Sequence, residues 1–293
     1  MNFGGIEMGG TKMVCAISNE NGEILEQVRF DTRSPEETLK EMADYFKQKD
    51  IKALGVASFG PVDLNKKSNT YGYITETPKT EWKHTDVVGF FKKELNIPIG
   101  FDTDVNAACL GEVIYGAGKN FQNVIYGTIG TGVGFGVYLN GQLAHGLMHP
   151  EAGHVIIKKH KDDTYEGGCP YHINCFEGLA SGPAINKRWG KPFEDLSDNQ
   201  KAIEIEAFYI AEGLYNCIMC YSPEKIILGG GVMHNKNLFP LIRKEVIKQL
   251  NGYISKEEVF DIDNYIVEAD LKDNQGIIGA CELGKQEYYS NVR

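Results

Sequence analysis

The sequence predicts an α/β protein of two domains in which one structural unit is duplicated. The chain has 293 residues, of which 42% are apolar and 24% charged, and this length is sufficient for two hydrophobic cores. Candidate helices and strands alternate along both halves, which is typical of α/β layers. The same opening occurs twice, at Gly10-Thr11 and at Gly130-Thr131, and indicates an internal repeat.

Each opening consists of an apolar run that leads to an Asn-Gly pair. The first run covers 13–17 and leads to Asn21-Gly22, and the second covers 133–139 and leads to Asn140-Gly141. Asn-Gly between apolar runs predicts a β-hairpin, because both residues tolerate the positive φ of a type I′ turn. Each half is therefore expected to begin with a strand, a Gly-Thr turn, a strand, a hairpin and a strand.

The remaining elements follow from periodicity and from helix start and stop signals. In the first half we expect helices at 35–47, 86–95 and 104–115, and strands at 53–59 and 97–101. In the second half we expect helices at 199–220, 239–250 and 274–285, and strands at 225–228 and 266–268. The glycines near 116–118 predict the domain boundary. The first domain would span 1–117, completed by a C-terminal helix within 273–293, and the second would span 118–272.

Composition excludes several classes of partner. Forty acidic side chains against 30 basic ones give a formal charge of −10, which repels nucleic acid and anionic membranes. The N-terminus shows neither the basic nor the apolar region of an export signal, so we expect a cytoplasmic protein. Residues 121–150 contain no Lys, Arg, Asp or Glu, but glycines interrupt them, and this predicts buried strands and turns instead of a membrane span.

The seven cysteines are an odd set in a chain expected in a reducing compartment, so metal binding is favoured over disulfides. Cys169, His172 and Cys175 have the spacing Cys-x2-His-x2-Cys, and His154 lies shortly before them. Two cysteines and two histidines can complete a tetrahedral zinc site. The alternative is a chance cluster. A further pair, Cys217 and Cys220, has helical spacing with apolar neighbours and predicts core packing.

The glycine-rich turns do not fit two common nucleotide motifs. Residues 5–12 resemble a P-loop, but the order is Thr-Lys and a strand follows, whereas 127–136 and 229–231 lack the helix of the dinucleotide fingerprint. What remains is a strand-turn-strand cradle whose backbone N–H groups face phosphate oxygens, with a hydroxyl each from Thr11 and Thr131. Taken alone, either turn could be a simple hairpin corner.

Two carboxylates are candidates for chemistry. Glu7 precedes the first glycines and could hold Mg²⁺ through water, or could be an exposed strand acid. Asp104 follows a buried strand at the start of a helix, whose N-terminus favours an ionised carboxylate. It could accept a proton from a substrate hydroxyl. The alternative is ordinary helix capping by Asp102 or Thr103 with no catalytic role.

Several short motifs follow one another along the chain in a highly specific order: Glu7-Met8-Gly9-Gly10-Thr11-Lys12, Asp104-Val105-Asn106-Ala107-Ala108, Gly127-Thr128-Ile129-Gly130-Thr131-Gly132-Val133-Gly134, Glu151-Ala152-Gly153-His154, Cys175-Phe176-Glu177 and Gly229-Gly230-Gly231. Together they resemble the ROK family of sugar kinases and regulators. The resemblance implies a duplicated, two-domain actin/hexokinase-like (ribonuclease H-like) fold with a cleft between the domains. The first motif is more similar to the bacterial fructokinases of the family than to its glucokinases, which usually carry Asp where Glu7 stands.

The resemblance also implies a role for each matched residue. Asp104 would be the general base, and the sugar would be bound by Thr103, Glu151, His154 and Glu177. The ATP phosphates would lie between Gly9, Gly10, Thr11 and Lys12 on one side and Thr131 and Gly132 on the other. Adenosine would be bordered by Pro183, Gly229, Gly230 and Gly231. Mg²⁺ would be held through water by Glu7, and zinc would be held by His154, Cys169, His172 and Cys175 and would fix the sugar loop.

Two positions depart from the family pattern. Family glucokinases usually have Asn before the catalytic Asp, and the hydroxyl of Thr103 cannot reproduce the donor and acceptor pair of that amide. Many members bind zinc with three cysteines, whereas His172 replaces one here. We therefore expect an ATP- and Mg²⁺-dependent fructokinase that forms fructose 6-phosphate, with domains that close over its substrates, and a homodimer.

Three alternatives stay open at this point. The acceptor could be glucose, mannose or an N-acetylated amino sugar. The chain could be a non-catalytic, sugar-responsive regulator of the same fold, but such regulators carry a DNA-binding module before the first Gly-Gly-Thr, and only eight residues precede Gly9. It could also be a catalytically silent zinc scaffold.

Overall fold

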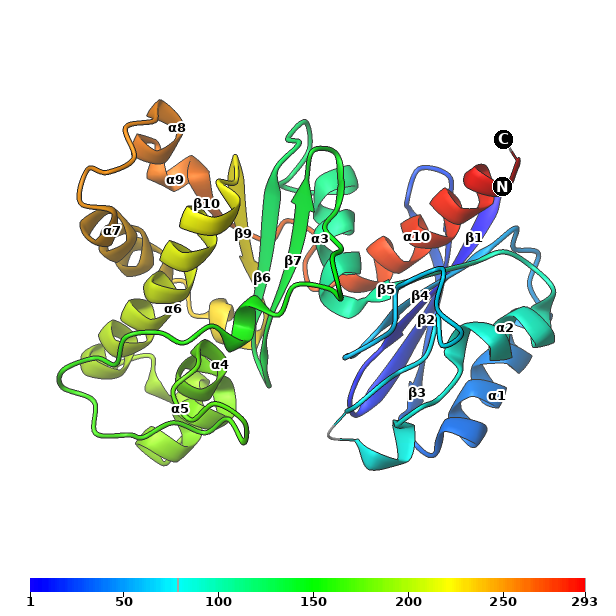
Figure 1. Cartoon of the computed structure of the whole chain (residues 1–293), viewed down its shortest axis with the longest axis horizontal. Helices are drawn as coiled ribbons and strands as arrows, with labels where there is room; N and C mark the ends of the chain where they lie inside the picture. The colour runs from blue at the N-terminus through cyan, green and yellow to red at the C-terminus, as the bar shows by residue number, and fades with distance from the viewer. Residues whose placement is uncertain (78, 293) are drawn as a thin grey trace. The chain divides into compact units, whose positions relative to one another are not determined.

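The protein is an α/β chain that divides into two compact units (Figure 1). The computed structural model describes residues 1–77 and 79–292. The first unit comprises Met1–Gly116, Leu143–Pro150 and Asn274–Arg293, and the second comprises Ala117–Gln142 and Glu151–Asp273. The short segment Leu143–Pro150 thus groups with the first unit, although the sequence placed it within the second domain, 118–272. None of the described helices could span a membrane.

The first unit is built on a five-stranded sheet with the order β3-β2-β1-β4-β5. The antiparallel part consists of β1 (Asn2–Met8), β2 (Lys12–Asn19) and β3 (Ile24–Asp31). The parallel part adds β4 (Leu54–Ser58) and β5 (Ile99–Thr103) to β1. The helices of this unit are α1 (Pro35–Lys47), α2 (Val87–Leu95), α3 (Asp104–Tyr115) and α10 (Gln275–Val292).

The two faces of this sheet are packed differently. One face carries large apolar side chains, among them Met8, Val56 and Phe101, which pack with residues of α1 and α2. The other face carries glycines, and α10 lies close against it. A Cβ on Gly55 would lie 1.8 Å from the carbonyl oxygen of Ala280, so only glycine allows this approach. Helix α10 also packs on α3.

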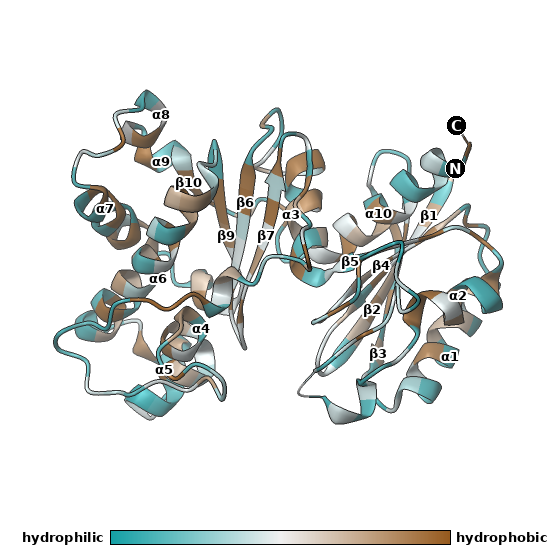
Figure 2. Cartoon of the chain, in the orientation of Figure 1, coloured by the Kyte–Doolittle hydropathy of each residue, from teal (hydrophilic) through white to brown (hydrophobic). Residues whose placement is uncertain are grey.

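The second unit repeats the same strand order, β10-β9-β6-β7-β8. Its strands are β6 (Val124–Ile129), β7 (Val133–Leu139), β8 (Gln142–Leu143), β9 (Lys225–Gly229) and β10 (Ile266–Glu268). Strand β6 takes the central place of β1, antiparallel to β7 and parallel to β9. The predicted duplication is therefore confirmed. Figure 2 shows hydrophobic residues along β6, β7 and β9, which form the core of this unit.

Helices of two lengths surround the second sheet. The long ones are α6 (Gln200–Tyr221) and α7 (Leu238–Leu250), which pack on each other. The short ones are α4 (Phe176–Ala180), α5 (Gly182–Trp189), α8 (Glu257–Phe260) and α9 (Ile262–Tyr265), none of which the sequence analysis predicted. Short 3₁₀ turns lie at Thr80–Trp82, Ala152–His154, Phe193–Leu196 and Gly231–His234.

The two Asn-Gly hairpins differ. Asn140 and Gly141 both have positive φ, 51° and 80°, as a type I′ turn requires. At the first hairpin only Gly22 has positive φ, 80°, so the type I′ prediction is wrong there. The reason is the side chain of Asn19, whose Oδ1 accepts hydrogen bonds from the backbone N–H groups of Asn21 and Glu23 and holds a wider loop.

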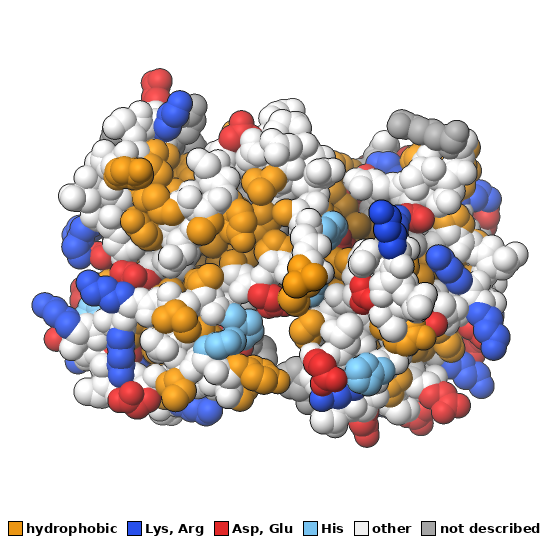
Figure 3. Space-filling view, in the orientation of Figure 1, with side chains coloured by type: hydrophobic (Ala, Val, Ile, Leu, Met, Phe, Trp, Pro, Cys, Tyr) orange, Lys and Arg blue, Asp and Glu red, His pale blue; other side chains and the backbone are white. Residues whose placement is uncertain are grey.

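Charged side chains of both signs lie on the face of the molecule shown in Figure 3. Acidic and basic residues are interspersed over the face shown in Figure 3, so the excess of acidic residues forms no single patch there.

Of the two cysteines predicted to pack in the core of α6, Cys217 is buried but Cys220 is exposed, because it lies on the outer side of the last helical turn.

Candidate active site

The parallel strands of the first unit end at one edge of its sheet. In the strand register Glu7 lies beside Ala57, and Ala57 beside Asp102. One residue later along each strand, Met8, Ser58 and Thr103 are aligned in the same way. The chain therefore leaves β1 into residues 9–12 and leaves β5 into α3 at the same edge. This edge is where α/β sheets commonly bind ligands.

Asp104 is the first residue of α3, but it does not cap the helix. Thr103 is the N-cap, and its Oγ1 accepts a hydrogen bond of 3.1 Å from the backbone N–H of Asn106. Thr103 is buried and engaged in this contact. The Asp104 carboxylate accepts a hydrogen bond of 2.9 Å from the N–H of Val105, and the residue is half-buried.

Burial raises the pKa of Asp104 to about 6, although backbone N–H groups at the helix start act in the opposite direction. The sequence led us to expect that the helix terminus would dominate and favour ionisation. The removal of the carboxylate from water outweighs that effect. A carboxylate with this pKa is largely ionised at neutral pH and is well matched to accept a proton.

Glu7 is half-buried in β1 and is not a simple exposed strand acid. Burial and, second, the negative charge of Asp104 raise the pKa of Glu7 to about 7, while Lys12 and Arg29 lower it. Two carboxylates that repel each other in a partly desolvated place favour a bound cation, which would relieve the repulsion. The residues present therefore fit the expected magnesium ion.

A cluster of side chains that the sequence did not predict supports the start of α3. Asp102 is 3% exposed, and its Oδ1 accepts a hydrogen bond of 2.7 Å from Asn106 Nδ2. Its Oδ2 lies 2.8 Å from Nε2 of His145, and this contact raises the pKa of His145. His149, close by in sequence, accepts a hydrogen bond of 3.3 Å from the N–H of Val62 through Nε2. No spacing in the sequence pairs either histidine with its partner.

Residues Gly9, Gly10, Thr11 and Lys12 form a tight turn between β1 and β2, which we call the 9–12 turn. The N–H of Gly9 donates a hydrogen bond of 3.0 Å to the carbonyl oxygen of Lys12 and closes the turn. Gly10, Thr11 and Lys12 are exposed. The turn is therefore accessible from solvent, and its role as a phosphate cradle stays a prediction.

Three segments predicted to border ATP lie together in the second unit. Residues 130–132 form the turn after β6, and the N–H of Gly182 donates a hydrogen bond of 2.7 Å to the carbonyl oxygen of Gly130. Strands β6 and β9 are aligned, with Thr128 beside Gly229, so the 229–231 turn leaves the sheet at the same edge. Gly230 has a φ of 91°, and a Cβ there would lie 2.5 Å from the carbonyl oxygen of Ile129. Thr131, Pro183 and Gly231 are exposed in this group.

The two glutamates of the second unit that are predicted to bind sugar, Glu177 and Glu151, have different surroundings. Glu177 on α4 is half-buried, and its Oε2 accepts a hydrogen bond of 3.1 Å from the N–H of Val133, next to the 130–132 turn. This contact, which the sequence did not predict, links α4 to that turn. Glu151 is exposed and directly precedes the 3₁₀ turn that carries His154. Their roles toward a sugar stay predictions.

The four predicted zinc ligands converge. The ligand atoms of His154, Cys169, His172 and Cys175 all lie within 4.8 Å of one another. Nδ1 of His154 lies 3.8 Å from Sγ of Cys169 and 3.6 Å from Sγ of Cys175. Ligands of a tetrahedral zinc ion with bonds of about 2.0–2.3 Å are separated by roughly 3.3–3.8 Å. The two His154 distances lie in this range and the distance of 4.0 Å between Nδ1 of His172 and Sγ of Cys169 lies slightly above it, so the set fits the ion after small side-chain movements. Cys175 also caps α4, where its Sγ accepts from the N–H of Gly178.

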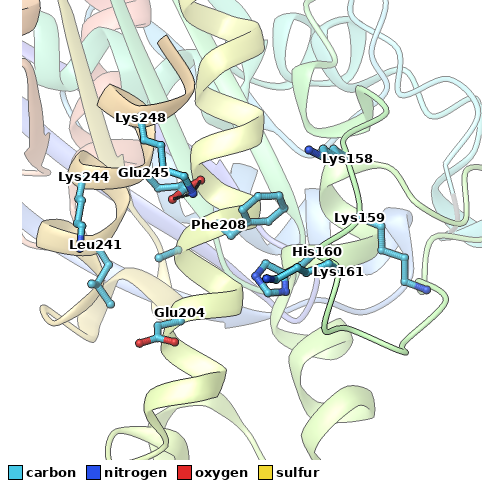
Figure 4. Close-up of a pocket in the computed structure, with 11 residues that line it drawn as sticks. Lys158, Lys159, His160, Lys161, Glu204, Phe208, Leu241, Lys244, Glu245 and Lys248 are labelled. Carbon is cyan, nitrogen blue, oxygen red and sulfur yellow. Dashed lines mark hydrogen bonds and ion pairs between the residues drawn. The ribbon is translucent and has the colours of Figure 1, made fainter. Parts of the chain in front are cut away.

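Among the described residues, two cavities differ in whether predicted site residues line them: one has none of them in its lining, and the other has Gly10. The larger, about 490 Å³, lies in the second unit between α6, α7 and residues 158–161, and Figure 4 shows the lysines that surround it. It contains none of the predicted site residues. The smaller, about 380 Å³, lies beside Gly10 of the 9–12 turn in the first unit.

Comparison with known proteins identifies the family. The sequence pattern that defines the ROK family matches residues 3–287.

The chain belongs to the ROK family.

It is 50% identical to a protein of Bacillus subtilis (strain 168), over 97% of this chain and 95% of the relative. It is 44% identical to the fructokinase of Pediococcus pentosaceus, over 97% of this chain and 98% of the relative. The ROK hexokinase of Thermus thermophilus shares the fold, with a TM-score of 0.81 and 22% identity over 99% of this chain and 100% of that structure. The fold is thus the expected actin/hexokinase-like one.

Proposed function

We propose that this ROK protein is an ATP-dependent fructokinase that forms fructose 6-phosphate. The observation that carries the proposal is Asp104, a half-buried carboxylate with a pKa of about 6, at the sheet edge where the 9–12 turn also begins. Fructose as the acceptor is supported by the 44% identity, over nearly the full length of both chains, to the fructokinase of Pediococcus pentosaceus.

In the proposed reaction Asp104 accepts the proton of the sugar hydroxyl. As this proton leaves, the hydroxyl oxygen forms a bond to the γ-phosphorus of ATP, and the bond between that phosphorus and the bridging oxygen of ADP breaks. The proton stays on Asp104 and the electron pair of the broken bond leaves with ADP. Thr103 and Asp102 contribute by fixing the start of α3, which sets the direction of the Asp104 carboxylate.

ATP would be held by the turns of both units. In the first unit the exposed Gly10, Thr11 and Lys12 would contact phosphate oxygens. In the second unit Thr131 and Gly132 would do the same, and the 181–183 and 229–231 segments would border adenosine. Glu7 would hold Mg²⁺ through water, and the ion would neutralise part of the phosphate charge during transfer.

The zinc ion is proposed to have a structural role. His154, Cys169, His172 and Cys175 supply a closed set of four ligands, which leaves no open position for chemistry. His154 follows Glu151 by three residues, and Cys175 precedes Glu177 by two. A zinc ion at this place would therefore fix the two predicted sugar-binding glutamates relative to each other. The homodimer and the cytoplasmic location stay predictions from the sequence.

The first prediction concerns the acceptor. We expect kcat/KM for fructose to exceed that for glucose, mannose and N-acetylated amino sugars by at least about tenfold, since Thr103 cannot supply an amide contact. A coupled assay of ADP release over a panel of these sugars measures this directly. A clear preference for another hexose, or ADP release with none of them, would contradict the proposal.

The second prediction concerns Asp104. The Asp104→Asn variant is expected to lose about 10³-fold in kcat because it removes the general base, while its Kd for ATP stays within about twofold. In the unchanged protein a carboxyl with a pKa of about 6 accepts a proton only when ionised, so kcat/KM should fall about tenfold per pH unit below pH 6 and level off above it.

Steady-state kinetics between pH 5 and pH 8.5 check both expectations. The matched control is Asp44→Asn, which changes an exposed aspartate on α1 and should leave kcat and the pH profile unchanged. An Asp104→Asn enzyme that retains most of its turnover would overturn the assignment, as would a profile that stays flat down to pH 5.

The third prediction concerns the metal. Elemental analysis of the purified protein should find about one zinc per chain, and Cys169→Ser should lose it. Because the ion is assigned no chemical step, Cys169→Ser should raise KM for fructose more than it lowers kcat. Cys220→Ser, which alters an exposed cysteine away from the four ligands, serves as control. Protein purified without chelators that contains no zinc would refute the site.

A further inference from the structure

The cavity beside the 9–12 turn has a basic lining that no predicted role explains. It measures about 380 Å³ and is bordered by Gly10, Thr32, Arg33, Ser34, Lys79, Thr80, Glu81 and Trp82. Of these residues only Gly10 belongs to a motif of the sequence analysis. The lining combines two cationic side chains, three hydroxyl groups and one carboxylate. Such a set suits an anion with several oxygen acceptors.

Lys79 lies directly against the 9–12 turn. Its Nζ donates a hydrogen bond of 2.6 Å to the carbonyl oxygen of Gly10. A Cβ on Gly10 would lie 2.8 Å from the same Nζ, which is closer than side chains tolerate. The glycine at position 10 therefore leaves room for the ammonium group at the surface of the turn.

Aromatic residues hold the Lys79 side chain in this place. Its ammonium lies 5.5 Å from the ring centroid of Phe59, within the range of a cation–π contact. The Phe59 ring packs edge-on against Trp82 at 5.7 Å, and Trp82 is only 3% exposed. The indole N–H of Trp82 donates a hydrogen bond of 3.2 Å to the carbonyl oxygen of Arg33. The position of the ammonium is thus set before any ligand binds.

Lys79 also differs from its charged neighbours in having no acidic partner. Within residues 1–77 and 79–292, no carboxylate lies within ion-pair distance of its Nζ, although Glu81 borders the same cavity. By contrast, Lys83 forms an ion pair of 2.6 Å with Glu76, and Arg33 is paired with Glu41. In a chain of net charge −10, an ammonium without an acidic partner beside an exposed glycine turn is placed to receive an anion.

We propose that Lys79 is a phosphate-binding residue and that its ammonium contacts the phosphoryl group that is transferred from ATP. This inference rests on the proposed kinase function and extends it to a residue outside the family motifs. On binding, the ammonium exchanges part of its contact with the Gly10 carbonyl for non-bridging phosphate oxygens. The ammonium offsets the negative charge on those oxygens while Asp104 takes the proton of the sugar.

The test compares ligands that differ in their phosphates. Isothermal titration with ATP and with AMP, each in the presence of Mg²⁺, is carried out on the unchanged full-length protein and on Lys79→Met, Lys79→Arg and Lys83→Met. Methionine retains the length of the side chain and removes its charge. Lys83→Met is the matched control, since it removes a lysine of the same loop that is paired away from the turn. Steady-state kinetics and thermal melting accompany the titrations.

We expect Lys79→Met to weaken ATP binding by at least about tenfold, to leave AMP binding within about twofold, and to lower kcat/KM for ATP by about 100-fold. Lys79→Arg should regain most of the ATP affinity, and Lys83→Met should behave as the unchanged protein. Unchanged ATP binding in Lys79→Met would overturn the proposal. Equal weakening of ATP, AMP and fructose binding with a lower Tm would also overturn it, because it would indicate a purely structural role.

The proposed function can fail separately from this inference. An unchanged protein that binds ATP but phosphorylates no hexose would refute the kinase assignment. The comparison of ATP with AMP would still decide whether Lys79 binds the terminal phosphates, because it does not depend on turnover.

Discussion

The candidate site depends on one geometric constraint, the alignment of parallel strands that end at the same edge of a sheet. In the first unit this alignment brings Glu7 at the end of β1 into line with Asp102 at the end of β5, so that Asp104 begins α3 close to the 9–12 turn. Burial raises the pKa of both Glu7 and Asp104, and the negative charge of Asp104 raises the pKa of Glu7 further. A cation is favoured at such a site because it offsets the two negative charges, and a carboxylate whose pKa is raised accepts a proton more readily. Phosphoryl transfer needs both a cation and a proton acceptor.

Because of the duplication, the second unit has an equivalent sheet edge, where β6 and β9 end, but different residues stand there. The turn after β6 occupies the position of the 9–12 turn, and the end of β9 occupies that of β4. Thr128, glycines and Thr131 stand at the strand ends and in the turn in place of acids, and the carboxylate beside them, that of Glu177, comes from α4. The cluster of His154, Cys169, His172 and Cys175 leads into α4, and α4 adds a polar group beside the same turn through the contact between Glu177 and Val133. One repeated architecture thus provides two sheet edges whose strand ends differ in charge, with Glu7 and Asp102 in the first unit and Thr128 and Gly229 in the second.

The sequence predicted the features whose signals are local. The long helices follow from apolar periodicity, the second hairpin from Asn140-Gly141, and the zinc cluster from a compact spacing of Cys and His. It failed where a side chain contacts a residue far along the chain. His145 joins Asp102, and Lys79 joins Gly10, across 43 and 69 positions, and no pattern in the sequence links these pairs. The direction of the pKa shift of Asp104 could not be predicted either. A helix terminus can be recognised from the sequence, whereas the extent of burial depends on packing.

The closeness of Glu7 and Asp104 is open to direct measurement through the titration of Glu7. Its carboxyl can be followed by ¹³C NMR in Mg²⁺-free protein, in the unchanged chain and in Asp104→Asn. We predict a pKa of about 7 in the unchanged protein and a lower pKa in the variant, because the charge of Asp104 contributes to the rise. A Glu7 pKa near the ordinary value of about 4.3 in both proteins would contradict the strand alignment on which the site depends.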